Sequence, residues 1–76
     1  MRKQTIQYGS VVDALVAVAK RLSRYEIRYN MESEDFFNRY NSGQMGDEFD
    51  LVEWANDYRH YLAIRSEVEK HVRNAA

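Results

Sequence analysis

Two long stretches of the chain repeat apolar residues at alternating spacings of three and four, and no proline interrupts them. This heptad pattern places a seam of such residues along one side of a helix, as in helices that pack lengthwise against a neighbour. The first stretch carries the seam residues Val11, Leu15, Val18, Leu22, Tyr25 and Tyr29. The second carries Leu51, Trp54, Tyr58, Tyr61, Arg65, Val68 and Val72. The two seams predict two long helices that pack against each other.

The bounds of the long helices are predicted from their capping residues. Ser10 is a favourable N-cap for a helix over about 11–29. Either Asp47 or Asp50 can cap the second helix, over about 50–74, because a carboxylate accepts hydrogen bonds from the free N–H groups of the first turn.

A short corner helix is predicted between the two long ones. Asn30 suits a left-handed residue at the end of the first long helix. Ser33 is the expected N-cap of a helix over about 34–42, which Gly43 would end as a left-handed glycine. Such a corner would reverse the chain and make the two long helices antiparallel.

The expected architecture is therefore a single all-α domain over residues 1–76, with residues 1–9 as an extended N-terminal arm. A second apolar stripe accompanies each seam and exceeds what one neighbouring helix can cover. These additional residues are Val12, Val16 and Ala19 in the first helix and Val52, Ala55 and Leu62 in the second. Because small domains without staples often gain stability by association, the excess predicts a protein partner or self-association.

Composition favours a cytoplasmic protein. The chain has no cysteine, which excludes disulfides and thiolate metal sites. Its first residues are polar and basic, unlike a secretory signal. The longest apolar run, 14–19, is far shorter than the ~20 residues that a membrane-spanning helix needs, so no membrane insertion is expected.

Charge is distributed unevenly along the chain. Residues 1–29 carry a net charge of +4, residues 30–57 carry −7 and residues 58–76 carry +2. Nucleic-acid binding usually needs one dominant basic face, and Arg2 and Lys3 alone would add little affinity for phosphate. DNA binding is therefore not expected, whereas the acidic middle would suit a basic protein partner.

Residues 29–54 read Tyr-x-Met-x-Ser-x-x-Phe-x-x-Arg-Tyr-x-x-Gly-x-Met-Gly-Asp-x-x-Asp-x-x-Glu-Trp. This stretch resembles a signature of small bacterial antitoxin-like proteins from type II toxin–antitoxin modules. The matching residues are Tyr29, Met31, Ser33, Phe36, Arg39, Tyr40, Gly43, Met45, Gly46, Asp47, Asp50, Glu53 and Trp54. The resemblance implies that the motif belongs to a body that binds a cognate toxin, usually an RNA-cleaving enzyme.

The same motif also has a structural explanation, in which Phe36, Tyr40, Met45 and Trp54 form a hydrophobic plug at the corner. In the functional interpretation, the acidic segment from Asp47 to Glu53 faces a basic toxin surface. Both explanations stay open. The candidate partner-binding residues are Val11, Leu15, Val18, Leu22, Tyr25, Tyr29, Phe36, Tyr40, Asp47, Asp50, Glu53, Trp54, Tyr58 and Tyr61. The alternative to a toxin-binding protein is a self-assembling helical module, such as a homodimeric four-helix bundle.

Catalytic and metal sites are not expected. Arg65 and His71 have a spacing found in a class of helical RNases, but Arg65 occupies a seam position. Glu53, Asp57 and His60 share one face of a helix, but a single helix supplies only three ligands. We therefore predict no enzyme activity, metal or cofactor.

Overall fold

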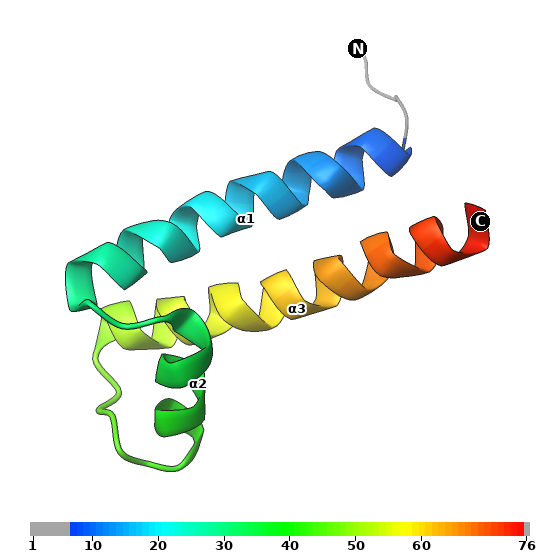
Figure 1. The fold of residues 1–76 in the computed structure, drawn as a ribbon. Coiled ribbons are helices and arrows are strands. Elements are labelled where there is room, and N and C mark those ends of the chain that lie inside the picture. The colour runs from blue at the N-terminus through cyan, green and yellow to red at the C-terminus, as the bar shows by residue number, and fades with distance from the viewer. Residues whose placement is uncertain (1–6, 76) are drawn as a thin grey trace.

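The computed structural model describes residues 7–75, which form three helices joined by short turns (Figure 1). They are α1 (Gln7–Tyr29), α2 (Ser33–Asn41) and α3 (Phe49–Ala75). No strand occurs in this part of the chain, and the predicted all-α class is confirmed. The bounds of α2 and α3 match the predicted ones to within one residue at each end. None of the described helices is long and apolar enough to span a membrane.

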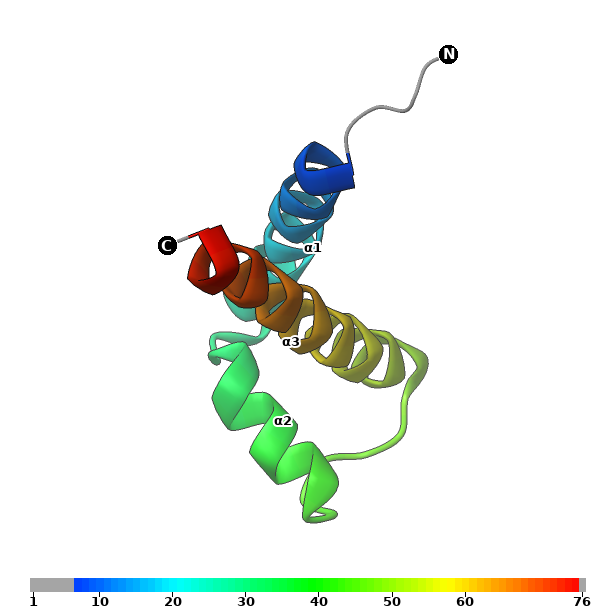
Figure 2. The same ribbon diagram turned by 90° about the vertical axis from the view of Figure 1, so that its right-hand side faces the viewer.

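The two long helices run antiparallel. Arg21 forms an ion pair with Asp57 at 3.2 Å, whereas Arg28, farther along α1, pairs with Asp50 at 3.4 Å. Later positions on α1 thus meet earlier positions on α3, which is the order of an antiparallel pair. α2 packs against α3 and α1 at one end of this hairpin only (Figures 1 and 2). We call this half, residues 22–58, the corner end.

The turn after α1 follows the predicted geometry. Asn30 has a φ of 53°, in the left-handed region. The N–H of Met31 donates a hydrogen bond to the carbonyl of Glu26 at 3.2 Å. This pattern is the Schellman motif, which satisfies a free carbonyl of the last helical turn. The predicted left-handed stop is confirmed.

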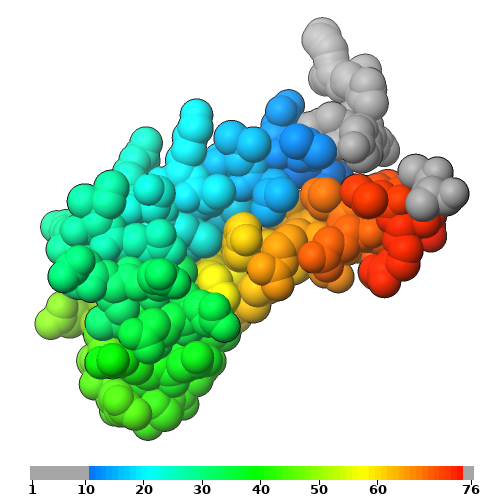
Figure 3. Space-filling model, in the orientation of Figure 1, coloured from blue at the N-terminus to red at the C-terminus, as the bar shows by residue number. Residues whose placement is uncertain are grey.

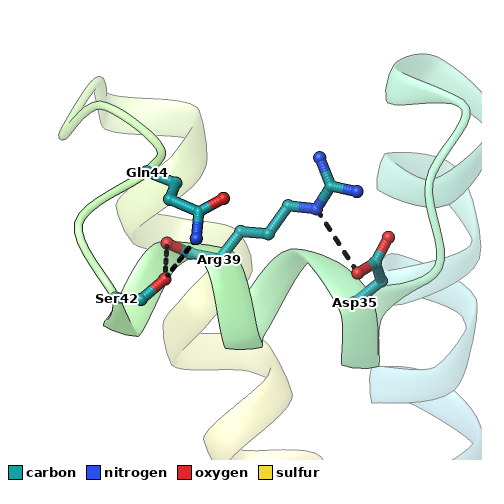
Figure 4. A network of polar contacts seen from close by, with 4 residues as sticks. All are labelled: Asp35, Arg39, Ser42 and Gln44. Atoms are coloured by element: carbon teal, nitrogen blue, oxygen red, sulfur yellow. Dashed lines mark hydrogen bonds and ion pairs between the residues drawn. The ribbon is translucent and has the colours of Figure 1, made fainter.

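The turn after α2 is built in the same way. Gly43 has a φ of 81°, and the N–H of Gln44 donates to the Arg39 carbonyl at 2.9 Å. Figure 4 shows the polar side chains around this turn. Ser42 Oγ donates to the Arg39 carbonyl at 3.1 Å, and Gln44 Nε2 donates to Ser42 Oγ at 3.1 Å. Arg39 also pairs with Asp35, one helical turn earlier, at 3.4 Å.

The start of α1 differs from the prediction. The helix begins at Gln7, so residues 7–9 of the expected extended arm are helical and Ser10 lies inside the helix. Gly9 is the only strong helix breaker in this stretch, and its cost of about 1 kcal/mol relative to alanine is too small to end a helix. The rest of the expected arm, residues 1–6, lies outside the described residues.

The predicted N-caps are also wrong in detail. Glu32 holds the N-cap position of α2 and makes no side-chain cap hydrogen bond, while Ser33 is already helical. The Ser33 N–H is instead capped by the Glu26 carboxylate of α1, at 3.0 Å. Asp50 lies in the first turn of α3, and the carbonyl of Glu48 receives its first hydrogen bonds.

The core lies at the corner end. Its buried cluster consists of Leu22, Phe36, Leu51, Trp54 and Ala55. The opposite half of the hairpin, residues 11–16 and 62–74, is the open end, where no side chain is fully buried. The chain has a radius of gyration of 14.6 Å, whereas a compact chain of this length would have about 11 Å. Figure 3 shows the same asymmetry, with the bulk of the molecule gathered around α2.

Candidate functional site

Trp54 is the centre of the corner. Its ring lies parallel to that of Phe36, with centroids 3.8 Å apart, and both side chains are 0% exposed. Tyr25 and Tyr29 of α1 stack on the same indole, with centroids 5.5 and 5.4 Å away. Three aromatic rings from two other helices thus enclose this tryptophan, and stacking adds to the energy of burial.

A buried hydrogen bond completes this enclosure. Trp54 Nε1–H donates to Ser33 Oγ at 2.9 Å, and Ser33 is 2% exposed. Glu26 fixes the backbone of the same serine, as described above. A buried indole N–H needs such an acceptor, because leaving it unpaired costs about 1–3 kcal/mol. The serine of the signature therefore orients the tryptophan rather than capping α2.

The remaining aromatic residues of the candidate partner-binding set lie around this core. Tyr40 packs beside Phe36 at 5.5 Å, and Tyr58 contacts Phe37 at 5.0 Å and Tyr61 at 5.9 Å. All three tyrosines are half-buried. Burial, followed by the nearby charge of Glu34, raises the pKa of Tyr58, and burial together with Asp57 raises the pKa of Tyr25. Both phenols are therefore neutral hydrogen-bonding groups at physiological pH.

The structure buries four of the fourteen predicted partner-binding residues inside the protein itself and leaves most of the others half-buried. The fully enclosed ones are Val18, Leu22, Phe36 and Trp54. These four side chains have almost no surface to offer a partner in this fold. The half-buried ones are Val11, Leu15, Tyr25, Tyr29, Tyr40, Asp50, Glu53, Tyr58 and Tyr61, and only Asp47 is exposed. The expected hydrophobic plug at the corner is present, since Tyr40 and Met45 pack against the buried cluster.

The acidic segment is partly neutralised within the chain. Asp50 pairs with Arg28 and also accepts a hydrogen bond from the Tyr29 hydroxyl at 3.4 Å. Within residues 7–75, no ion pair involves Asp47 or Glu48, and both are exposed. The carboxylates available to a basic partner are therefore those that precede α3.

Four large apolar side chains are exposed, and none of them is among the fourteen candidate partner-binding residues. They are Val16 at 48%, Ile27 at 79%, Phe49 at 76% and Val72 at 59%. Val16 belonged to the predicted second stripe and Val72 to the seam. Ile27 and Phe49 lie off both seams. The sequence could have indicated the exposure of Phe49. Its neighbours Glu48 and Asp50 are acidic, and an apolar side chain between two acidic residues has no adjacent apolar residue to pack against.

Two hollows flank the hairpin near α2. One, of about 300 Å³, lies between α1, α3 and the start of α2, and its walls include Ala19, Tyr58 and Tyr61. The other, of about 220 Å³, lies on α1 and is lined by Arg21, Arg24, Tyr25 and Arg28. Since Arg21 and Arg28 already pair with aspartates of α3, this second hollow is part of the ionic contact between the helices.

The residues considered for chemistry lie apart or are engaged elsewhere. The Arg65 guanidinium lies 5.4 Å from the Tyr61 ring centroid and 3.8 Å from Glu69, and a hydrogen bond with Tyr61 raises the pKa of this arginine. His71 is an exposed residue of α3. Among the described residues, no three His, Cys, Asp or Glu side chains form a group that could hold a metal ion.

The corner and the exposed apolar side chains are the two main features of the described surface and core. The structure combines an aromatic corner that orders the hairpin with apolar side chains that no other element covers. Comparison with known proteins gives no match for this chain among protein-family models, curated proteins or solved structures.

Proposed function

We propose that the protein is a non-catalytic binding protein that occludes a cognate toxin, as an antitoxin does. The observation that carries this proposal is a stripe on the outer side of α1 with two exposed apolar residues, Val16 and Ile27, separated by the polar residues Lys20 and Ser23. At about 100° per residue, Val16 and Ile27 lie on the side of α1 nearly opposite Val18 and Tyr29, which face the core. Ala19, which is exposed beside this stripe, lines the hollow next to α2.

The stripe fits a groove on another protein. An amphipathic helix commonly binds by laying apolar side chains at helical spacing into such a groove. Fully burying a valine or isoleucine side chain contributes about 1.5–3 kcal/mol. Val16 and Ile27, which are largely exposed here, are therefore the expected anchors on α1.

The start of α3 and the two acidic residues before it supply a second contact. Phe49 is exposed between the acidic residues Glu48 and Asp50, with Asp47 just before them. An aromatic anchor flanked by carboxylates suits a basic surface, such as one that binds RNA phosphates. The choice of an RNA-cleaving toxin as partner rests on the resemblance of residues 29–54, and the encounter would take place in the bacterial cytoplasm.

The test is co-expression with each neighbouring open reading frame, followed by size-exclusion chromatography with light scattering and a growth assay. We expect one neighbour to inhibit growth, and this protein to form a complex with it and relieve the inhibition. The double variant Val16→Asp, Ile27→Asp should weaken the complex by about tenfold or more, because it places carboxylates where apolar anchors would be buried.

A matched control for a change of −2 is the double variant Ala63→Asp, Ser66→Asp, which adds two carboxylates at exposed positions of α3. It should leave the complex unchanged, and circular dichroism should show all variants to be helical. A toxin complex that survives the double substitution in α1 would exclude this face. The absence of any binding neighbour would overturn the antitoxin proposal itself.

A further inference from the structure

A second stripe runs along α3, on a different helix from the proposed toxin-binding face, and it is half-buried at Tyr58 and Leu62 and exposed from Arg65 onward. Its members are spaced by four, three, four and three residues, so they share one side of the helix. They are Tyr58, Leu62, Arg65, Glu69 and Val72. The ring and cation contacts between α2 and α3 are those of Phe36 with Trp54 and of Phe37 with Tyr58 and Arg59, and no such contact extends farther along α3 among the described residues. The start of α2 borders the same hollow as Arg65, and Arg65, Glu69 and Val72 are all exposed.

The part of this stripe from Leu62 onward is self-complementary. It reads apolar, basic, acidic, apolar at Leu62, Arg65, Glu69 and Val72, and it is symmetric about position 67. If two copies of α3 pair antiparallel about a two-fold axis at that position, Leu62 meets Val72 of the second copy. Arg65 then meets Glu69 of the second copy, and each contact occurs twice.

No like charges meet at the axis of this arrangement. Glu67 lies about 180° around α3 from the centre of the stripe, at 100° per residue. Its carboxylate instead contacts Lys70 on that outer side, at 3.7 Å.

Within the chain these groups make only surface contacts, including that of the Arg65 guanidinium with the Tyr61 ring. Arg65 and Glu69 are separated by 3.8 Å, and both are largely exposed, which is the geometry of a weak surface pair. Val72 is 59% exposed. A shallow, mostly apolar hollow of about 430 Å³ lies over Val68, Glu69, Val72 and Arg73, and a side chain of another helix could fill it.

We propose that the occupant of this stripe is a second copy of the same chain, bound as an antiparallel α3–α3 pair with Arg65 facing Glu69 in both directions. The two hairpins then form a dimer with the two α2 helices at its outer ends. The α1 stripe containing Val16 and Ile27 is not used in this contact, so the dimer does not depend on the proposed toxin.

The first test is the oligomeric state of the full-length chain without a partner, measured by sedimentation equilibrium over a wide concentration range. We expect a reversible dimer. A monomer at every concentration would overturn the proposal, including the case in which the stripe is covered only in a complex with another protein.

Charge reversal identifies the interface. Arg65→Glu alone and Glu69→Arg alone should each weaken the dimer by about tenfold or more, because each creates two repulsive pairs at the axis. The double variant Arg65→Glu, Glu69→Arg restores opposite charges in every pair and should return the dissociation constant to the wild-type value. The matched control Glu67→Lys, on the outer side of α3, should leave it unchanged.

Because the chain has no cysteine, crosslinking can test the register directly. The double variant Leu62→Cys, Val72→Cys should oxidise to a covalent dimer, since positions ten residues apart on one helix, about 15 Å, cannot form a bond within one chain. A dimer that ignores the single charge reversals, is not restored by the double reversal, or fails to crosslink would overturn this interface.

Discussion

The corner end and the open end of the hairpin differ in what holds the two long helices together. At the corner, Trp54 contacts aromatic rings from α1 and α2 and a buried hydroxyl. At the open end, aliphatic residues of the same heptad pattern are only half-buried or exposed. An identical spacing of apolar residues therefore produces the clustered core at the end that α2 covers, while Val18 is the one seam residue outside the corner end that is fully buried among the described residues.

This difference suggests that the corner end provides most of the stability of the fold, and that the open end is the part available for binding. A chain of this length is expected to be stable by about 4–11 kcal/mol in total, so one well-packed cluster decides whether it folds. The open end contributes fewer buried contacts and is free to exchange its exposed surface for a partner's. Regions with few buried contacts open locally at low cost, and such regions often carry binding function.

The largest expected effect comes from removing the centre of the corner. Trp54→Ala should destabilise the protein by about 3–5 kcal/mol, because it deletes a fully buried ring and leaves a cavity between Phe36 and α1. Urea denaturation followed by circular dichroism measures this change. Val72→Ala, at the open end, is the control and should change the stability of the monomer by less than about 0.5 kcal/mol. Equal losses in the free energy of unfolding for the two variants would show that the corner end and the open end contribute equally to stability.

Removing the hydrogen bond inside the corner should have a smaller effect. Ser33→Ala leaves the Trp54 Nε1–H buried without an acceptor and should cost about 1–3 kcal/mol. The exposed Ser42 offers a matched control, since Ser42→Ala removes a hydroxyl that water can replace. A shift in tryptophan fluorescence of the Ser33 variant would report the changed indole environment. If both substitutions lower the melting temperature equally, the buried bond contributes no more than a surface one.

The regular part of this fold could be predicted from the sequence. Heptad spacing located both long helices, and Asn30 and Gly43 marked the two left-handed turns. These features are local, because a helix depends on neighbours three or four residues away and a turn on a single backbone angle. The start of α1 at Gln7 was not predicted, because no residue in 7–9 strongly favours a helical over an extended backbone.

The assignment of side chains to core or surface could not be predicted in the same way. Spacing places Tyr25 and Tyr29 on one side of α1, but not against the indole of Trp54. Ser33 has the usual chemistry of an N-cap, and only the approach of α3 turns its hydroxyl toward that indole. The exposure of Phe49 likewise depends on how the connector passes from α2 to α3. Each of these facts is a contact between elements distant in sequence.

Alkaline pH should weaken the corner. The pKa values of Tyr25 and Tyr58 are raised above 10.0 in the folded protein, mainly by burial, so the unfolded chain loses these protons first. Stability is then fully present below about pH 10 and falls as the pH rises through the folded pKa values. Melting temperatures measured across this range should fall less in the double variant Tyr25→Phe, Tyr58→Phe, which keeps the rings but cannot ionise. A parallel decline in wild type and variant would show that other groups cause the loss.

The smallest effect is expected at the open end of α1. Val16→Ser should change the stability of the isolated protein by less than about 0.5 kcal/mol, because this side chain is 48% exposed and lies outside the buried cluster. Val18→Ser, two residues away and 1% exposed, is the matched comparison and should cost several times more, since it places a hydroxyl in an apolar contact. Urea titrations of the two variants, made at a concentration where the protein is monomeric, give both values. A large loss in the Val16 variant would mean that the chain itself covers this stripe in solution, and the face would then no longer be available to a partner.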